Sequence, residues 1–287
     1  MLHRQDWFQG CKEKLYEQSW HPDRKDVPPI CTLILVHGLA EHSGRYLRQA
    51  KELVQHRIEV FAYDQIGHGQ SGGERAFMHR FDDLVTDLET FVSRVQHRNQ
   101  GRPVFIMGHS MGGAVVAKFL MTRRPQDIRG WIFSSAALKI SDSVSGLLRA
   151  VAPVIGALMP RLSTQKLPAH LISRDEAEVA AYVNDPLNYV GGTRARTGSE
   201  ILKACQFFEA HFHEVVAPLL IFHGTADELT DPEGSRRFYE RAASLDKTFI
   251  PYEGYYHETM NDLGREAVLQ NLIQWITERT LTLYFDG

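Results

Sequence analysis

One serine of this sequence lies in a setting that favours nucleophilic chemistry. The segment Gly108-His109-Ser110-Met111-Gly112 fits the pattern G-x-S-x-G. The apolar residues 104–107 before it predict a strand, and residues 113–116 after it predict the start of a helix. The two glycines permit a tight turn that projects the serine hydroxyl above a sheet, and the helix N-terminus favours developing negative charge. The segment therefore predicts Ser110 as the nucleophile of an acyl transfer.

A serine hydroxyl is a poor nucleophile until a base takes its proton, and the chain has 14 histidines. Sequences with this serine turn place first the acid and then the histidine after the serine, at the carboxyl ends of strands. His257 follows a predicted strand at 248–252, whereas His211 and His213 precede the strand that should supply the acid. We therefore expect His257 to be the base.

The acid is expected just beyond the predicted strand 218–223. Asp227 follows that strand, and we expect it to orient His257. Glu228 and Asp231 are its nearest rivals. In the alternative interpretation these two only accept backbone N–H groups at the start of the following helix.

Acyl transfer also requires hydrogen-bond donors for the oxyanion of the tetrahedral intermediate. One expected donor is the backbone N–H of Met111, next to the nucleophile. The other is expected from the loop after the first parallel strand, and the N–H of Leu39 is the candidate. His37 and Gly38 would shape this loop.

Two further patterns suggest cofactors, and neither has the required context. Residues 67–72 match G-x-G-x-x-G, but the next helix is predicted to begin only near Phe81, so no helix N-terminus cradles a pyrophosphate. His211 and His213 lack a cysteine or carboxylate at ligand spacing and are expected on a helix surface. We expect no cofactor and no metal.

These residues must be positioned by alternating strands and helices, which predict an α/β fold with a mostly parallel central sheet flanked by helices. The expected strands are 30–36, 58–63, 104–107, 130–133, 218–223 and 248–252, and the expected helices are 46–56, 81–98, 110–123, 232–243 and 265–280.

The alternation stops for about 80 residues after Ser135, which predicts an inserted helical cap. We expect the core at 1–136 and 214–287 and the cap, or lid, at 137–213. Pro153 is expected to kink or break the first cap helix. Apolar residues spaced three and four apart form a stripe along that helix, at Val144, Leu147, Leu148, Val151, Val154, Ile155, Leu158, Met159 and Leu162. Its far side carries few charges, so it is either a buried cap helix or a surface that touches a membrane or another subunit.

Composition excludes several classes of protein. With 43% hydrophobic and 23% charged residues the chain is typical of globular proteins. The 32 Lys and Arg against 35 Asp and Glu give a net charge of −3 without long blocks of like charge, so nucleic acid is not an expected partner. Cys11, Cys31 and Cys205 form neither a disulfide framework nor a zinc site. No signal peptide and no apolar run long enough to span a bilayer is present, so we expect a cytoplasmic protein with peripheral membrane contact.

Six segments of the sequence resemble the monoacylglycerol lipases of the α/β-hydrolase superfamily. They are HGLAEHSGRY at 37–46, YDQIGHGQS at 63–71, GHSMG at 108–112, YVNDPL at 182–187, HGTAD at 223–227 and YEGYYH at 252–257. The resemblance covers the chain from Trp20 to Thr280. It implies a serine hydrolase with Ser110, Asp227 and His257 as the catalytic triad, and Leu39 and Met111 as oxyanion donors.

The same resemblance implies a cap over a channel for one acyl chain. It further implies that Glu41, Arg45, Tyr182 and Glu258 surround the glycerol end of the substrate. The expected reaction is hydrolysis of a small lipid ester to a fatty acid and an alcohol, with transient membrane contact through the cap. A general carboxylesterase, a lysophospholipase and a non-catalytic ligand-binding homologue of the same fold are the alternatives. Acyl-chain length, regiochemistry and oligomeric state stay open.

Overall fold

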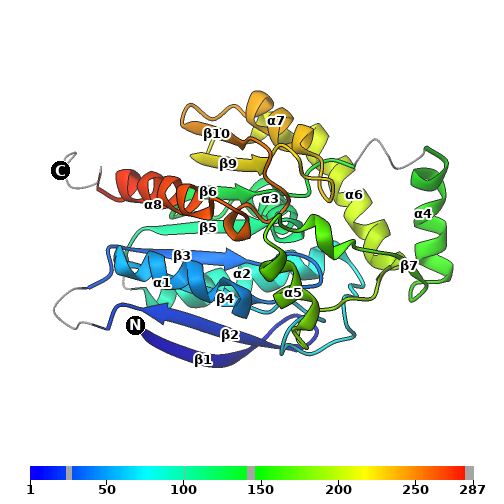
Figure 1. Cartoon of the computed structure of the whole chain (residues 1–287). Coiled ribbons are helices and arrows are strands. Elements are labelled where there is room, and N and C mark those ends of the chain that lie inside the picture. Colours follow the sequence, from blue (N-terminus) through cyan, green and yellow to red (C-terminus); the bar gives the residue numbers. More distant parts are fainter. Residues whose placement is uncertain (24–27, 100, 141–145, 282–287) are drawn as a thin grey trace.

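A mostly parallel sheet of eight strands forms the centre of the molecule (Figure 1). The computed structural model describes residues 1–23, 28–99, 101–140 and 146–281. The strand order is β1-β2-β4-β3-β5-β6-β9-β10. These strands are β1 (Leu2–Gln9), β2 (Lys14–His21), β3 (Cys31–Val36), β4 (Ile58–Tyr63), β5 (Val104–His109), β6 (Ile128–Ser134), β9 (Leu219–Gly224) and β10 (Lys247–Tyr252). β2 pairs antiparallel with β1 and β4, and the other pairs are parallel, which confirms the predicted sheet.

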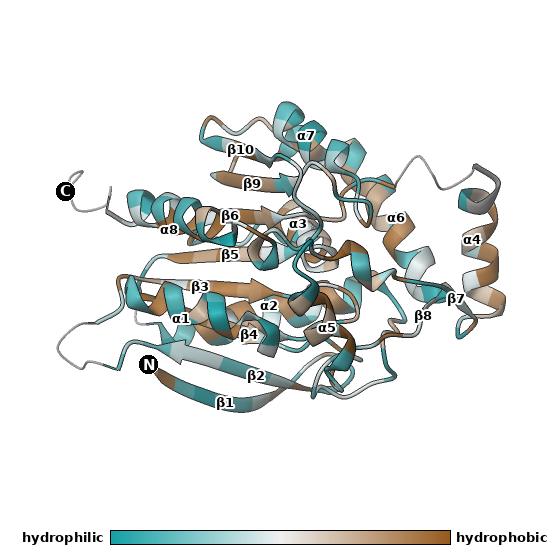
Figure 2. Ribbon diagram, viewed as in Figure 1, coloured by the Kyte–Doolittle hydropathy of each residue, from teal (hydrophilic) through white to brown (hydrophobic). Residues whose placement is uncertain are grey.

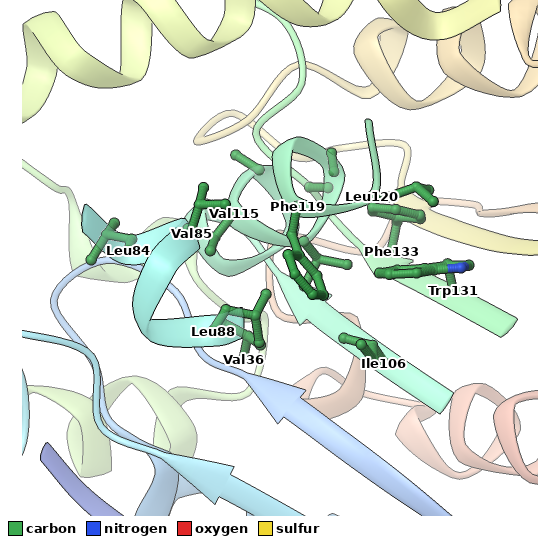
Figure 3. Packing of buried hydrophobic residues seen from close by; sticks show 14 of the residues in the cluster. Val36, Leu84, Val85, Leu88, Ile106, Val115, Phe119, Leu120, Trp131 and Phe133 are labelled. Carbon is green, nitrogen blue, oxygen red and sulfur yellow. The ribbon is translucent and has the colours of Figure 1, made fainter. Parts of the chain in front are cut away.

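Helices cover both faces of the sheet. α1 (Leu47–Gln55) and α8 (Arg265–Leu281) lie on one face, while α2 (Phe81–Arg98), α3 (Met111–Arg123) and α7 (Pro232–Arg241) lie on the other. Consecutive residues of β3 point to opposite faces and join different clusters of buried side chains. A strand covered on both sides needs a continuous apolar run, which explains the composition of β3. Figure 3 shows the core on the α2 and α3 face, against β3, β5 and β6.

The element that carries the predicted nucleophile is longer than the sequence predicted. β5 continues to His109, because this residue still pairs with Ser134 of β6 in the parallel ladder. α3 begins at Met111. Only Ser110 therefore connects strand and helix, and its position is fixed by regular structure on both sides.

Between β6 and β9 the chain leaves the central sheet. This stretch contains α4 (Gly146–Leu158), β7 (Ser163–Lys166), α5 (Glu176–Asn184), β8 (Gly192–Arg194) and α6 (Ala195–His211), with the short 3-10 helices η2 (Ala169–Leu171) and η3 (Phe212–Glu214). β7 and β8 pair with each other in a separate antiparallel sheet. We call residues 137–213 the cap segment. Two further 3-10 helices, η1 (Ser43–Tyr46) and η4 (Thr259–Asn261), lie in loops of the core.

The first cap helix, α4, packs against α6 at the far end of the molecule (Figure 1). Gly156 permits this approach, because a Cβ atom there would lie 2.8 Å from a side-chain atom of α6. The helix continues through Pro153 to Leu158, so the break considered from the sequence does not occur. Val144 of the predicted stripe lies outside the described residues.

Candidate active site

Ser110 forms a strained turn between β5 and α3. Its φ of 54° and ψ of −122° are unfavourable for a residue with a side chain. The flanking glycines make this turn possible. A Cβ atom on Gly108 would lie 2.4 Å from the carbonyl oxygen of Gly112, and one on Gly112 would lie 2.2 Å from the carbonyl oxygen of Val36. The backbone is therefore packed too closely for larger residues, and the serine is held at the start of a helix.

His257 and Asp227 form a short buried pair. His257 Nδ1 lies 2.7 Å from Asp227 Oδ2. Although burial opposes ionisation, the neighbouring His257 and His223 hold the pKa of Asp227 well below its usual range. Burial lowers the pKa of His257, yet the Asp227 carboxylate outweighs this effect and raises the pKa above its usual value. Asp227 therefore orients the imidazole and favours its protonated form.

The two rival carboxylates lie elsewhere. Glu228 is exposed to solvent. Asp231 caps α7, where its side chain accepts a hydrogen bond of 3.0 Å from the N–H of Glu233. Of the three candidate acids, the structure brings Asp227 to His257.

Sequence reasoning missed a second histidine on the same carboxylate. Buried His223 at the end of β9 lies with its Nε2 2.9 Å from Asp227 Oδ2 and its Nδ1 2.7 Å from Ser235 Oγ. Thr230 Oγ1 also donates to Asp227 Oδ2 at 2.8 Å. Asp227 is therefore held from several sides. The sequence did contain a signal for this contact, because His223 lies at the end of the strand that Asp227 follows.

The loop after β3 brings Leu39 beside the nucleophile. A Cβ atom on Gly38 would lie 3.0 Å from Ser110 Cβ, so this position requires the small residue that it has. His37 Nδ1 lies 2.7 Å from the carbonyl oxygen of Gly38, and His37 Nε2 accepts the N–H of Gln65 at 2.9 Å. Burial lowers the pKa of His37 and keeps this ring neutral, as both contacts require.

The two expected oxyanion donors are available for a ligand. Among the described residues, no backbone hydrogen bond uses the N–H of Leu39 or of Met111. Both residues line one cavity together with Ser110 and His257. No hydrogen bond joins the Ser110 hydroxyl to His257 in the part of the chain that the structure describes. Such contacts often tighten only when substrate is bound.

The cavity has a polar and an apolar side. Glu41, Glu258 and Tyr182 lie together around Arg45 and form the polar side, with His109 beside His257. Thr193 and Thr230 also line the cavity. Burial and the neighbouring His257 lower the pKa of His109 to about 4, so this ring is neutral near pH 7. Apolar residues complete the wall, and several of them come from the cap segment: Leu39, Met111, Ala137, Leu167, Ala169, Ile172, Ile201 and Leu229.

Arg45 does not line the cavity itself but binds two residues that do, Glu41 and Glu258. Its guanidinium donates to both carboxylate oxygens of Glu258, at 2.6 and 2.8 Å, and to Glu41 Oε2 at 3.0 Å. Burial raises the pKa of Glu41, but Arg45 outweighs this effect and brings the pKa to about 2. Burial and Glu41 raise the pKa of Tyr182 to about 12, so its hydroxyl stays protonated. Glu41 thus stays ionised beside the cavity, and Arg45 holds the carboxylates of Glu41 and Glu258 in place.

The two cofactor-like patterns have other structural roles. The glycine-rich segment 67–72 forms a loop that hydrogen-bonds to β2, and α2 begins only at Phe81. The ring of His211 stacks on Phe207 at 3.9 Å, and its Nδ1 lies 2.7 Å from the Phe207 carbonyl oxygen. The described residues contain no group of three or more His, Cys, Asp or Glu that could hold a metal ion. None of the described helices is long and apolar enough to cross a membrane.

Known proteins resemble this chain over nearly its whole length. A family profile described as serine aminopeptidase S33 matches residues 28–264. A monoacylglycerol lipase of Mycolicibacterium smegmatis is 35% identical, over 90% of this chain and 90% of that protein. The monoglyceride lipase of Homo sapiens is 34% identical, over 93% of this chain and 88% of that protein.

Solved structures give the same result. The monoacylglycerol lipase of Paleococcus ferrophilus superposes with a TM-score of 0.82 and 31% identity, covering 92% of this chain and 99% of that one. A monoglyceride lipase of Saccharomyces cerevisiae shares the fold with a TM-score of 0.85 and 22% identity, over 96% of this chain and 94% of that chain. The chain therefore belongs to the monoacylglycerol lipase family, whose members have the α/β-hydrolase fold.

Proposed function

We propose that this protein is a serine hydrolase that cleaves monoacylglycerols, or closely similar single-chain esters, to a free fatty acid and glycerol. The observation that carries the proposal is one cavity lined by Ser110, by His257 with Asp227 behind it, and by the unused N–H groups of Leu39 and Met111. Relatives with that activity in their names support the substrate class.

In this mechanism Ser110 Oγ attacks the ester carbonyl carbon while His257 Nε2 takes the hydroxyl proton. The N–H groups of Leu39 and Met111 bind the oxyanion. Collapse of the intermediate breaks the bond between the carbonyl carbon and the alcohol oxygen, and His257 returns the proton to that oxygen, so that glycerol leaves. A water molecule, activated by His257, then attacks the acyl group on Ser110. The fatty acid leaves and the serine regains its proton.

We assign the polar side of the cavity to glycerol. Carboxylates that are held in place, as those of Glu41 and Glu258 are by Arg45, accept hydrogen bonds from hydroxyl groups. Tyr182 adds a hydroxyl, and Arg45 acts by fixing the two carboxylates. No Lys or Arg is among the described residues that line the cavity. A phosphate group would lie beside two carboxylates whose cation, Arg45, is already paired with them and does not line the cavity, which argues against a lysophospholipase.

The cap segment, residues 137–213, would act as the cover of the acyl channel and as the surface that meets lipid. The outward residues of α4 are Ala150, Pro153, Val154, Ala157 and Leu158, which form one stripe of the helix and are all exposed. Val154 is 57% exposed and Leu158 is 78% exposed. Figure 2 shows α4 as a largely hydrophobic helix. Such a face suits an enzyme whose substrate is dissolved in a membrane.

A cytoplasmic location with this peripheral contact fits the cysteines. All three are free thiols, and burial raises the pKa of Cys31 and Cys205 to about 12. Unpaired thiols are typical of reducing compartments.

The experiment that tests the proposal compares turnover of 1- and 2-monoacylglycerols of several chain lengths with a triacylglycerol, a lysophospholipid and a short soluble ester. Monoacylglycerols should have the highest kcat/KM, and Ser110→Ala should lose more than a hundredfold in a folded protein. Equal turnover of short and long esters would indicate a general carboxylesterase. Retained activity in Ser110→Ala would reject the nucleophile.

A further inference from the structure

The residue after the proposed oxyanion donor has an unfavourable backbone conformation. Ala40, which follows Leu39, has a φ of 67°, in the left-handed region that favours glycine. Relaxation of Ala40 out of this region would turn the Leu39–Ala40 peptide and thereby shift the short loop that carries the Leu39 N–H, which belongs to the preceding peptide. Contacts from elsewhere in the chain must therefore hold this loop in the form that places Leu39 on the cavity beside Ser110.

The cap segment supplies that restraint at the carbonyl group of Ala40. The oxygen accepts the backbone N–H of Tyr189 at 3.0 Å and the hydroxyl of Tyr182 at 3.3 Å. Both donors come from α5 or the turn that follows it, about 140 residues away in the chain. The ring of Tyr182 also lies 4.9 Å from the Arg45 guanidinium, which fixes its direction.

A second restraint joins the same two segments through His42 and Asp185. His42 Nδ1 accepts the N–H of Gly44 at 3.1 Å, so the ring proton is on Nε2, which donates to Asp185 Oδ2 at 2.9 Å. Asp185 Oδ1 accepts the N–H of Leu187 at 2.9 Å. Each oxygen of the carboxylate therefore has a donor, one from the loop after β3 and one from the cap segment.

We propose that Tyr182, Asp185 and Tyr189 are positioning residues that hold the loop of residues 37–42 in the form that binds the oxyanion. This inference rests on the proposed function, because it assigns Leu39 as a donor in acyl transfer. In this proposal α5 and the turn after it affect the chemical step, because they hold the loop that binds the oxyanion. The helix α4, at the other end of the cap, instead affects substrate entry. Loss of the restraint should therefore affect short and long esters alike.

The test uses Asp185→Asn, with Glu178→Gln as its matched control. An amide that still accepts the Leu187 N–H presents its NH2 group to the N–H of His42, so two donors meet and the restraint is lost. Glu178 lies on α5, the helix that ends directly before Asp185, and joins the cap to the core through Arg48 at 2.6 Å, away from this loop. Both changes replace a carboxylate by an amide of the same shape.

We expect Asp185→Asn to lower kcat about tenfold or more for both a short soluble ester and a long-chain monoacylglycerol, with KM within about twofold. Binding of a trifluoromethyl ketone, which forms a tetrahedral adduct with serine, should weaken by a similar factor. Glu178→Gln should stay within about twofold in every assay. Adding Ala40→Gly to Asp185→Asn should restore part of kcat, because glycine adopts the required φ without strain.

A second variant covers the case in which Asp185→Asn does not fold. Tyr182→Phe removes one hydrogen-bond donor to the carbonyl oxygen of Ala40. The assay uses an acetate ester that contains no glycerol, so that loss of a contact between Tyr182 and glycerol does not contribute to the change in kcat. The inference is overturned if Tyr182→Phe and Asp185→Asn match Glu178→Gln, or if they raise KM and leave kcat unchanged. The proposed function still holds in that case, provided that the wild-type enzyme hydrolyses esters and Ser110→Ala does not. Absence of esterase activity in the wild-type protein would instead reject the proposed function together with this inference.

Discussion

At the residue scale, the site depends on how the Asp227 carboxylate is shared. Its Oδ2 atom accepts hydrogen bonds from the side chains of His257, His223 and Thr230, and its Oδ1 atom accepts hydrogen bonds from two backbone N–H groups. The carboxylate therefore stays ionised although it is buried. Its charge raises the pKa of His257, the proposed base, which must be neutral in order to accept the serine proton.

The raised pKa of His257 predicts the pH dependence of the reaction. Because the base acts in its neutral form, kcat/KM should fall as the pH decreases through a value above 6.5. Asp227→Asn removes the negative charge, so the acidic limb of the pH–rate profile should move to lower pH. The plateau of kcat/KM should fall by about 10³-fold or more, because the imidazole loses its orientation. A pH–rate profile of both proteins measures the two effects. A limb that stays in place in Asp227→Asn would contradict the assignment.

His223 should contribute through its hydrogen bond rather than through packing. Replacement by Leu removes a donor to Asp227 in a buried position, and we expect kcat to fall about tenfold with a shift of the acid limb. His223→Gln can still donate an amide N–H and should keep most of the activity. Kinetics across pH, with melting temperatures to compare stability, distinguish the variants. Equal losses in both would mean that only the shape of the histidine matters.

At the element scale, the sequence predicts what depends on local pattern. The apolar run of β3 and the G-x-S-x-G turn locate the sheet and Ser110, because burial in β3 and close backbone packing at Gly108 and Gly112 leave few other residues possible. The hydrogen bond from Tyr182 to Ala40 and the contact of His223 with Asp227 were not predicted. The first joins residues far apart in the chain, and the second depends on side-chain direction at a strand end. Neither leaves a periodic signal.

The outward stripe of α4 gives a prediction for this element alone. Replacing Val154 and Leu158 with Glu should weaken binding to lipid vesicles and raise the apparent KM for a long-chain monoacylglycerol, because the charges must stay in water. Turnover of a short soluble ester should stay within about threefold, a difference below about 1 kcal/mol. Vesicle sedimentation and the two assays measure these effects.

The control changes exposed polar residues of the same segment, Ser163 and Gln165, to Glu. This variant should bind vesicles more strongly than the α4 variant, because its added charges are not on the stripe. Equal losses with both substrates in the α4 variant would indicate disturbed packing against α6. Unchanged vesicle binding would reject the membrane contact.

At the scale of the whole molecule, stability should depend on pH through buried histidines. Burial lowers the pKa of His37, brings that of His68 to about 3 and, together with His257, brings that of His109 to about 4. The unfolded chain takes up these protons near pH 6.5, whereas the folded protein does not, so stability falls as the pH decreases from about 6.5 towards 4. His257 acts in the opposite direction, but only above about pH 6.5, where the raised pKa lets the folded state bind this proton before the unfolded chain does.

Below about pH 6.5 His257 carries its proton in both states, so the three lowered groups leave a difference of up to three protons. The free energy of unfolding should therefore fall by up to about 4 kcal/mol per pH unit in this range, before the carboxylates protonate. Urea unfolding at several pH values measures the slope. His68→Gln should reduce it by about 1.4 kcal/mol per pH unit, while replacement of the exposed His56 by Gln should leave it unchanged. A slope near zero between pH 6 and 4.5 would show that these rings accept protons inside the fold.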